Sequence, residues 1–439
     1  MKARKQGRWK RRVVTGGGVV LLLALVLWLG ALGYSRHEVR AQMAETVARL
    51  DALDGISANN VIKRDGFFSA DGQLRLTRSD RTSEESPALV LDWQLRYGVL
   101  RTALSGRADL VEAGGRALFA DELSPGERVS FNARFQHLER SARLTVEAPA
   151  TLAWQQRDTA LTLDNAAVSF ESDGQGSRLA VDFSALDYRS PVRQLSLGAL
   201  HWSTRLHAAD SAAPDNKGEI GREDRLDVAN LHITRSGGLP LSAEELHFEG
   251  HTLHDGQQLR YPFSMALDNA AVSQQQVGSA TLEAELARID EQAARELVAL
   301  AGGELAARWQ SGALLEGGVL SLIRPWQDKV FALLSDSPQL RVDALTVDSG
   351  MLGHPLRLEG ALTLEGDDVQ RLSFAQLQTS WGRSAFRRRL NGDFVVHNAP
   401  PLLALVAGQQ PGQETLELSI REGALLINGE PWLLLDQGF

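Results

Sequence analysis

The feature that most constrains this chain is an uncharged stretch near its N-terminus. Val13 to Tyr34 reads VVTGGGVVLLLALVLWLGALGY, which is 22 residues. A helix of this length rises about 33 Å, enough to cross a hydrocarbon core of roughly 30 Å. Trp28 and Tyr34 suit the interface between lipid and water. The stretch predicts one transmembrane helix, and no second apolar run reaches 18 residues.

Charge on either side of the predicted span (13–34) indicates its orientation. Residues 1–12 carry seven Lys or Arg, whereas residues 35–54 carry three Arg and four acidic residues. The positive-inside rule places the basic tail in the cytoplasm and the body beyond the membrane. Arg-rich, Lys-poor composition suggests a bacterium, so we expect an inner-membrane anchor and a periplasmic body. The alternative is a cleaved signal peptide with Ala31-Leu32-Gly33 at its cleavage site.

Net charge and cysteine content exclude several classes of function. Once the seven basic residues of the tail are set aside, 39 Lys and Arg remain against 55 Asp and Glu. A body this acidic repels polyanions, so we expect no nucleic-acid partner. The chain has no cysteine, which excludes thiol catalysis, CxxC redox motifs and Cys-bound zinc.

Residues 35–55 predict an amphipathic helix next to the membrane. Val39, Met43, Val47 and Leu50 recur at spacings of four, four and three, which marks one apolar stripe. The stripe either packs on the protein's own sheet or meets a partner helix.

The body, 56–439, has the period of β-strands. Apolar residues alternate with polar ones, and Gly, Asp, Asn and Ser separate the runs. A unit of two alternating pairs with one extra residue between them recurs, as a β-bulge would produce. The fold class we predict is mainly β (α+β), a long curled, mostly antiparallel sheet with a few packed helices. The copies begin at Leu161, Leu195, Leu226, Leu241, Met265 and Leu340.

Polar loops and helical patterns interrupt this series. The loops are 79–87 and 207–223, and the second could separate halves 56–206 and 224–439. Helical spacing predicts helices at 282–300, from near Pro325 to residue 334, and at 400–407. Glu422-Gly423 predicts a hairpin turn near the C-terminus.

One polar cluster could bind a metal. His247, Glu249 and His251 would share one face of a strand, with His254 close behind, and such side chains are zinc ligands. However, neighbours on one face of a strand lie nearly 7 Å apart, too far to converge on an ion. We therefore predict no metal site, no cofactor and no catalytic residue, with a metal-dependent hydrolase at this cluster as the weaker alternative.

Four stretches resemble the YdgA-like family of uncharacterised bacterial proteins. They are WQLRYGVL (93–100), with Tyr97 and Val99 where the family has His and Pro, LARIDEQAARELVAL (286–300), 333–353, and INGEP (427–431). The resemblance implies one N-terminal span and a large periplasmic body, and implies no activity.

Together these observations predict a protein that is not an enzyme and that acts as an envelope-maintenance or interaction scaffold. Its partners would be the membrane, through the anchor, and envelope proteins or lipid. The alternative is a module that binds or transfers lipids or other hydrophobic ligands in an apolar β-groove. The alternatives differ in whether helices cover the apolar face of the sheet, because an uncovered apolar face needs a ligand or partner.

Overall fold

A computed structural model gives the fold. It describes residues 32–33, 35–48, 50–52, 56–78, 88–111, 128–156, 158–207, 220–255, 257–273, 275–297, 326–350, 352–377, 379–406, 408 and 414–434. The basic tail and the predicted span lie outside these residues, except for Leu32 and Gly33, and so do loop 79–87 and residues 208–219. Among the described residues, no helix combines the length and apolar character needed to cross a membrane.

The chain forms two compact units. Unit 1 comprises residues 1–152 and 167–175, and unit 2 comprises residues 153–166 and 176–439. The sequence instead suggested a boundary at loop 207–223. The strands on the two sides of that loop pair with each other, from Leu206 with Arg222 to Leu200 with Val228, so both belong to unit 2.

Unit 1 is an antiparallel sheet with one apolar face. Each of its strands pairs with the next one in the series. The series is β1 (Ile56–Asp65), β2 (Ser69–Arg78), β3 (Ala88–Arg96), β4 (Arg101–Val111), β5 (Val129–Gln136), β6 (Ser141–Glu147) and β9 (Ala167–Asp173).

A helix over residues 35–48 packs on unit 1. Val39 and Met43 lie against a buried cluster that contains Ala70, Trp93 and Leu95. The apolar stripe found in the sequence therefore contacts the protein's own sheet. Polar contacts hold the same helix in place, because Arg36 Nη2 donates to Asp65 Oδ1 at 2.9 Å.

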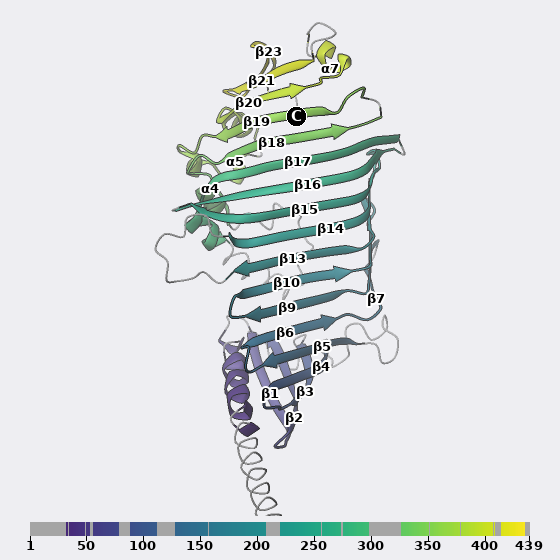
Figure 1. Ribbon diagram of the computed structural model, residues 1–439, viewed down its shortest axis with the longest axis vertical. Coiled ribbons are helices and arrows are strands. Elements are labelled where there is room, and N and C mark those ends of the chain that lie inside the picture. Colours follow the sequence, from purple (N-terminus) through teal and green to yellow (C-terminus); the bar gives the residue numbers. More distant parts are fainter. Residues whose placement is uncertain are drawn as a thin grey trace, which may run out of the picture. The chain divides into compact units, whose positions relative to one another are not determined.

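Unit 2 is a longer antiparallel sheet, and Figure 1 shows its strands stacked from β10 to β21. In the main series each strand again pairs with the next. Its strands are β10 (Gly176–Phe183), β13 (Leu200–His207), β14 (Ile220–Arg235), β15 (Leu241–Asp255), β16 (Gln258–Val272), β17 (Gln275–Asp290), β18 (Gln339–Asp348), β19 (Leu356–Leu364), β20 (Leu390–His397), β21 (Thr415–Arg421), β22 (Ala424–Ile427) and β23 (Glu430–Leu434).

A shorter series, β8 (Thr159–Asp164), β11 (Ala185–Arg189) and β12 (Arg193–Leu197), also joins β14. β14 pairs with β13 through its first half and with β12 through its second half. β7 (Thr151–Gln156) spans the boundary between the two units. The prediction of a mainly β, antiparallel fold with few helices is confirmed.

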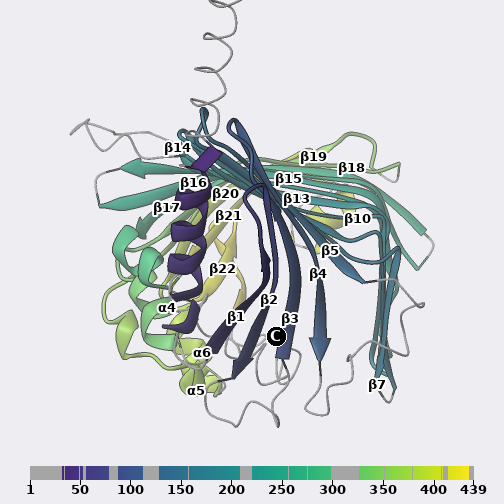
Figure 2. The same cartoon turned by 90° about the horizontal axis from the view of Figure 1, so that it is seen from below.

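The repeated unit in the sequence marks bends, although not always inside one strand. In β14, β15, β16 and β18 the strand continues through the extra residue. The two copies that begin at Leu161 and Leu195 are instead split into separate strands, β8 with β9 and β12 with β13. Seen from below, the strands of unit 2 curve (Figure 2).

The predicted helix at 282–300 is wrong over its first half. Residues 282–290 belong to β17, and only residues 291–297 are described as helical. Glu, Ala, Leu and Arg favour helices, but such propensity is weak against tertiary pairing. Leu282 pairs with Met265 on one side and Leu345 on the other. Leu282, Ala284 and Leu286 also alternate with polar residues, so the segment satisfies the strand period.

The other described helices are short. They are α4 (Gln327–Leu333), the 3-10 helix η2 (Val369–Arg371), α5 (Phe374–Leu377), α6 (Ser380–Arg387) and α7 (Pro401–Val406). α4 and α7 lie within the helices predicted near Pro325 and at 400–407. Glu422 and Gly423 form the predicted turn, with φ of 49° and 80° between β21 and β22.

Candidate functional site

The sheet of unit 2 has one face that is almost entirely apolar, which we call the apolar face. Its central row crosses ten strands in register. Because side chains alternate along each strand, residues paired directly across strands point to the same face. The row consists of Val181, Trp202, Leu226, Phe248, Met265, Leu282, Leu345, Leu358, Val396 and Leu416.

A second row on the same face is equally apolar. It runs across eight strands from β10 to β19. It consists of Phe183, Leu200, Val228, Leu246, Leu267, Ala280, Val347 and Leu356. The two rows make a continuous apolar surface. The alternation within each strand predicts that the strand has an apolar side, but the alignment of these sides depends on the register between strands.

The opposite face, which we call the polar face, carries charged and hydroxyl side chains. One row on it runs from β10 to β21 and alternates acids with histidines at its start. It consists of Asp182, His201, Asp227, His247, Ala266, Thr281, Thr346, Arg357, His397 and Thr415. The sheet is therefore amphipathic, and only its polar face is suited to contact with water.

Burial along the apolar face is uneven. At the C-terminal end of the central row, Val396 and Leu416 are buried, at 3% and 1% exposed. In the middle of the row Met265 is 39% exposed, and Phe248 and Leu282 are only half-buried. Other apolar residues on this face are also exposed, namely Leu206, Ile233 and Leu241.

Unit 1 shows what a covered apolar face looks like in the same chain. Leu95 and Leu144 point to the same face of its sheet, through the in-register residues Leu104 and Ala133. Leu95, beneath the helix at 35–48, is 4% exposed, whereas Leu144 is 36% exposed. The difference in exposure between Leu95 and Leu144 indicates that the helix is what buries Leu95.

The helices α4, η2, α5 and α6 of unit 2 pack mainly on each other. Phe331 of α4, Val369 and Leu372 form a buried cluster, and Phe374, Leu377 and Phe386 pack against it. Figure 2 shows α4, α5 and α6 close together near one end of the strands of unit 2. Within the described residues, Val228, Ala284 and Val342 are buried on this face, but the middle of the central row belongs to no buried cluster like that of unit 1.

One polar cluster interrupts the apolar face near the ends of β13, β14 and β16. Asp224 lies on this face, two residues from Leu226, and its side chain is 9% exposed. Arg222 Nε donates to Asp224 Oδ1 at 2.9 Å and to Thr204 Oγ1 at 3.2 Å. Tyr261 Oη donates to Asp224 Oδ2 at 3.0 Å. We call these four residues the Arg222 cluster.

Tyr261 reaches Asp224 by lying over Gly250. A Cβ added at Gly250 would come within 2.5 Å of Tyr261 Oη, so only glycine leaves room for the phenol ring. Burial raises the pKa of Tyr261, and the neighbouring Asp224 raises it further. The phenol therefore stays protonated and acts as a hydrogen-bond donor to the carboxylate.

The predicted metal candidates are not brought together. His247, Glu249 and His251 share the polar face as expected, but β15 runs straight through Gly250 without the turn that convergence would need. His247 Nδ1 instead lies 2.5 Å from Asp227 Oδ1. His254 points to the other face, with Nδ1 3.3 Å from Glu291 Oε1. In the part of the chain that the structure describes, no group of three or more His, Cys, Asp or Glu residues is placed to hold a metal ion.

The charged side chains around His247 on the polar face form ion pairs with one another. Arg225 bonds Asp227 and lies 3.2 Å from Glu249. The hydrogen bond from Arg225 is the main cause that holds the pKa of Asp227 below its usual range, with His247 adding to it. Such exposed pairs are ordinary surface chemistry.

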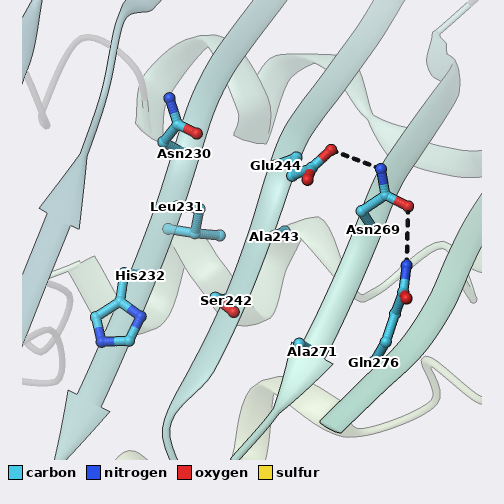
Figure 3. Close-up of a pocket in the computed structure, with 9 residues that line it drawn as sticks. All are labelled: Asn230, Leu231, His232, Ser242, Ala243, Glu244, Asn269, Ala271 and Gln276. Atoms are coloured by element: carbon cyan, nitrogen blue, oxygen red, sulfur yellow. Dashed lines mark hydrogen bonds between the residues drawn. The ribbon is translucent and has the colours of Figure 1, made fainter. Parts of the chain in front are cut away.

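A shallow pocket of about 430 Å³ lies on the polar face where β14, β15 and β16 bend (Figure 3). Asn269 Nδ2 donates to Glu244 Oε2 at 2.6 Å, and Gln276 Nε2 donates to Asn269 Oδ1 at 3.2 Å. The side chains at its centre thus bond one another and connect β15, β16 and β17, which is a structural role.

Comparison with known proteins gives a family. A family model described as "Bacterial protein of unknown function (DUF945)" matches residues 10–380. The chain belongs to this bacterial family. It matches no curated protein and no solved structure. The matched residues include every described residue of unit 1 and the strands β10 to β19 of unit 2, and therefore most of the apolar face.

Sequence reasoning missed the Arg222 cluster. Asp224 and Tyr261 are 37 residues apart, and only the register of three strands brings them together. One signal was available: Arg222 and Asp224 stand at positions that the alternation of β14 assigns to the apolar face. Charged residues at apolar-face positions mark either an error of register or a polar site.

Proposed function

We propose that this protein binds lipid acyl chains on the apolar face of unit 2. The observation that carries the proposal is the central row of that face, apolar across ten strands, with Met265 in its middle 39% exposed. Contiguous exposed apolar patches mark sites for a partner or ligand, and in this row Met265 is exposed while most of its neighbours are half-buried. Each methylene group that leaves water for such a surface contributes about 0.8 kcal/mol, so a long acyl chain can bind firmly.

The shape of the site favours a chain-like ligand. Rows of Leu, Val, Phe and Met run across successive strands, which suits an extended hydrocarbon better than a compact metabolite. No residue of this face is proposed to react with the ligand, so the role is binding or transfer rather than catalysis.

The proposed setting is the bacterial envelope. Residues 13–34 would anchor the chain in the inner membrane, with residues 1–12 in the cytoplasm and the body in the periplasm, as the charge asymmetry of the sequence supports. The resemblance of four stretches to YdgA-like proteins implies the same placement. An anchor would hold the apolar face near a source of lipid.

The competing proposal is an envelope scaffold, in which the apolar face packs on another protein. It accounts for the exposed apolar residues equally well. In the scaffold proposal the molecule on the apolar face is a protein, whereas in the first proposal it is a lipid, and a crosslink can tell which of the two is present.

Site-specific photocrosslinking in cells tests the proposal. Benzoylphenylalanine replaces Met265 in the full chain, and the cells are irradiated. The protein is then purified and analysed by mass spectrometry. We expect a lipid adduct at this position. The matched control places the crosslinker at Ala266, the next residue of β16 and on the polar face, where no lipid adduct is expected.

The outcomes separate the two proposals. A protein adduct at Met265 without lipid supports the scaffold and contradicts the lipid site. Equal lipid labelling at Met265 and Ala266 means nonspecific contact with membrane and also contradicts it.

A further inference from the structure

We infer that the Arg222 cluster binds the phosphate of a phospholipid headgroup while the acyl chains lie on the apolar face. This inference rests on the proposed function and adds the chemical class and the orientation of the ligand. Along β14 the apolar-face positions are occupied in order by Arg222, Asp224, Leu226 and Val228. The face is polar at one end of the strand and apolar toward the bend.

The neighbouring strands repeat this polarity. Thr204 of β13 pairs with Asp224, and Thr252 of β15 pairs with Arg222. Toward the bend the same strands present Trp202 and Phe248, which flank Leu226. At this end the three adjacent strands offer the Thr204 and Thr252 hydroxyls and the Arg222 guanidinium, with Leu206 of β13 as one apolar neighbour paired with Arg222, and at the other end they offer hydrocarbon. An amphiphile has the same distribution.

Arg222 is suited to hold an anion. Its contacts with Thr204 and Asp224 use the Nε–H and one N–H of Nη2. A guanidinium has five N–H donors, so in the described part of the chain three are left for further acceptors. The Arg222 side chain is 43% exposed, against 9% for Asp224. A ligand thus meets the cation before the carboxylate.

Among lipid heads, an anionic phosphate fits this arrangement better than a neutral head. The planar fork of arginine matches two oxygens of a phosphate, and hydrogen bonds between charged groups are about twice as strong as neutral ones. The Thr252 hydroxyl, on the strand beside Arg222, can donate to the same anion. Asp224 accepts hydrogen bonds from Arg222 and Tyr261, so part of the Arg222 charge is already offset and the anion is held mainly by the remaining N–H donors of Arg222.

The same strand supplies a matched control. Arg225 donates through Nε to Asp227 Oδ2 at 2.8 Å, just as Arg222 donates to Asp224 at 2.9 Å. Both pairs have the same spacing along β14, but Arg225 lies on the polar face. A general effect of removing an arginine would appear in both, whereas headgroup binding requires only Arg222.

Native mass spectrometry of the full chain in detergent provides the test. The protein is titrated with phosphatidic acid and with diacylglycerol carrying the same acyl chains. We expect phosphatidic acid to bind about tenfold more tightly, and Arg222→Gln to remove that advantage, as for loss of one charge-assisted contact. Diacylglycerol binding should not change, and Arg225→Gln should behave as wild type.

The results distinguish failure of the proposed acyl-chain site from failure of the headgroup assignment. If neither lipid binds, the proposed function itself fails. If both lipids bind equally, or if Arg222→Gln and Arg225→Gln weaken phosphatidic acid alike, the acyl site stands and the headgroup assignment is overturned. Displacement of phosphatidic acid by inorganic phosphate in large excess would identify free phosphate as the ligand of Arg222 and would also overturn it.

A further variant guards against misfolding. Arg222→Lys keeps the charge but loses the fork, so it should retain part of the preference for phosphatidic acid. If it binds the two lipids equally while unfolding at the wild-type temperature, the inferred role of the Arg222 charge is wrong.

Discussion

The Oγ of Ser35 lies 2.8 Å from Nε2 of His137, so a hydrogen bond joins the start of the helix at 35–48 to the end of β5. The same nitrogen lies 2.9 Å from Thr102 Oγ1, and Ser35 and Thr102 are both 3% exposed. Ser35 Oγ also donates to the carbonyl of Gly98 at 3.1 Å. This buried cluster anchors the helix that covers part of the apolar face of unit 1.

The stability of unit 1 should fall in mild acid because of His137. Burial lowers the pKa of His137 in the folded state, whereas in the unfolded chain it returns to about 6.5. The unfolded state then binds the proton first, so this contribution is complete above about pH 6.5 and is lost as the pH falls toward the folded pKa. Denaturant unfolding at several pH values, on wild type and His137→Gln, measures it. The stability difference between them should shrink as the pH falls, and a difference that is constant or grows would contradict the prediction.

Gly72→Ala should destabilise unit 1. A Cβ at this position would lie 2.4 Å from Cζ2 of the Trp93 ring and 2.5 Å from the Val61 carbonyl oxygen. Trp93 is buried, and its Nε1 donates to Asn60 Oδ1 at 3.0 Å, so the ring cannot move freely. Overpacking of this kind costs about 1–3 kcal/mol. Denaturant unfolding followed by tryptophan fluorescence measures the loss.

Gly174→Ala is the control for Gly72→Ala. Nothing lies within 4 Å of the added Cβ at Gly174, so its stability should stay within about 0.5 kcal/mol of wild type. Equal destabilisation by the two variants would show that the contact with Trp93 is not the cause.

Much of this fold can be predicted from single strands. The alternation of apolar and polar residues predicts the β-rich body, and Glu422-Gly423 predicts the last hairpin. What single strands do not contain is the register between them. The helix predicted at 282–300 is wrong over residues 282–290 because Leu282 lies between Met265 and Leu345, a relationship that involves three distant segments.

The candidate site depends on register in the same way. A sequence pattern indicates that each strand has an apolar side, but it does not reveal that ten such sides align. The histidine-rich stretch at 247–255 attracts attention because its residues are close in sequence. The Arg222 cluster, whose members come from β13, β14 and β16, has no such local signature.

Glu285→Gln should weaken unit 2. Glu285 Oε1 accepts from Arg260 Nε at 2.6 Å and Oε2 from Arg341 Nη2 at 2.9 Å, while its side chain is 5% exposed. Removing the carboxylate leaves two cations side by side, and breaking a buried ion pair costs about 3–5 kcal/mol. Because the arginines are 38% and 48% exposed, we expect about 1–3 kcal/mol in denaturant unfolding. Glu283→Gln, at an exposed position on the same face, should change little; an equal loss would contradict the ion-pair explanation.

The arginines also set the pH dependence of Glu285. The hydrogen bond from Arg260 is the main cause that lowers the pKa of Glu285 in the folded state, and Arg341 adds to it. Its contribution to stability is therefore present above the unfolded value of about 4.3 and is lost as the pH falls through the folded value. The stability difference between wild type and Glu285→Gln should shrink below that pH, and a difference that persists would contradict the assignment.

The bends of the sheet depend on asparagines in the left-handed conformation. The heptapeptide LDNAAVS occurs twice, and its asparagine, Asn165 or Asn269, has φ of 50° in both copies. Asparagine tolerates this conformation, glycine adopts it freely, and β-branched residues are strained there. Asn269→Gly should therefore keep the bend, whereas Asn269→Val should cost about 1–2 kcal/mol by strain alone. Both variants lose the bond to Glu244, so their difference in denaturant unfolding isolates the backbone effect. If the two unfold at the same denaturant concentration, the bend does not require a left-handed residue, and the repeated asparagine needs another explanation.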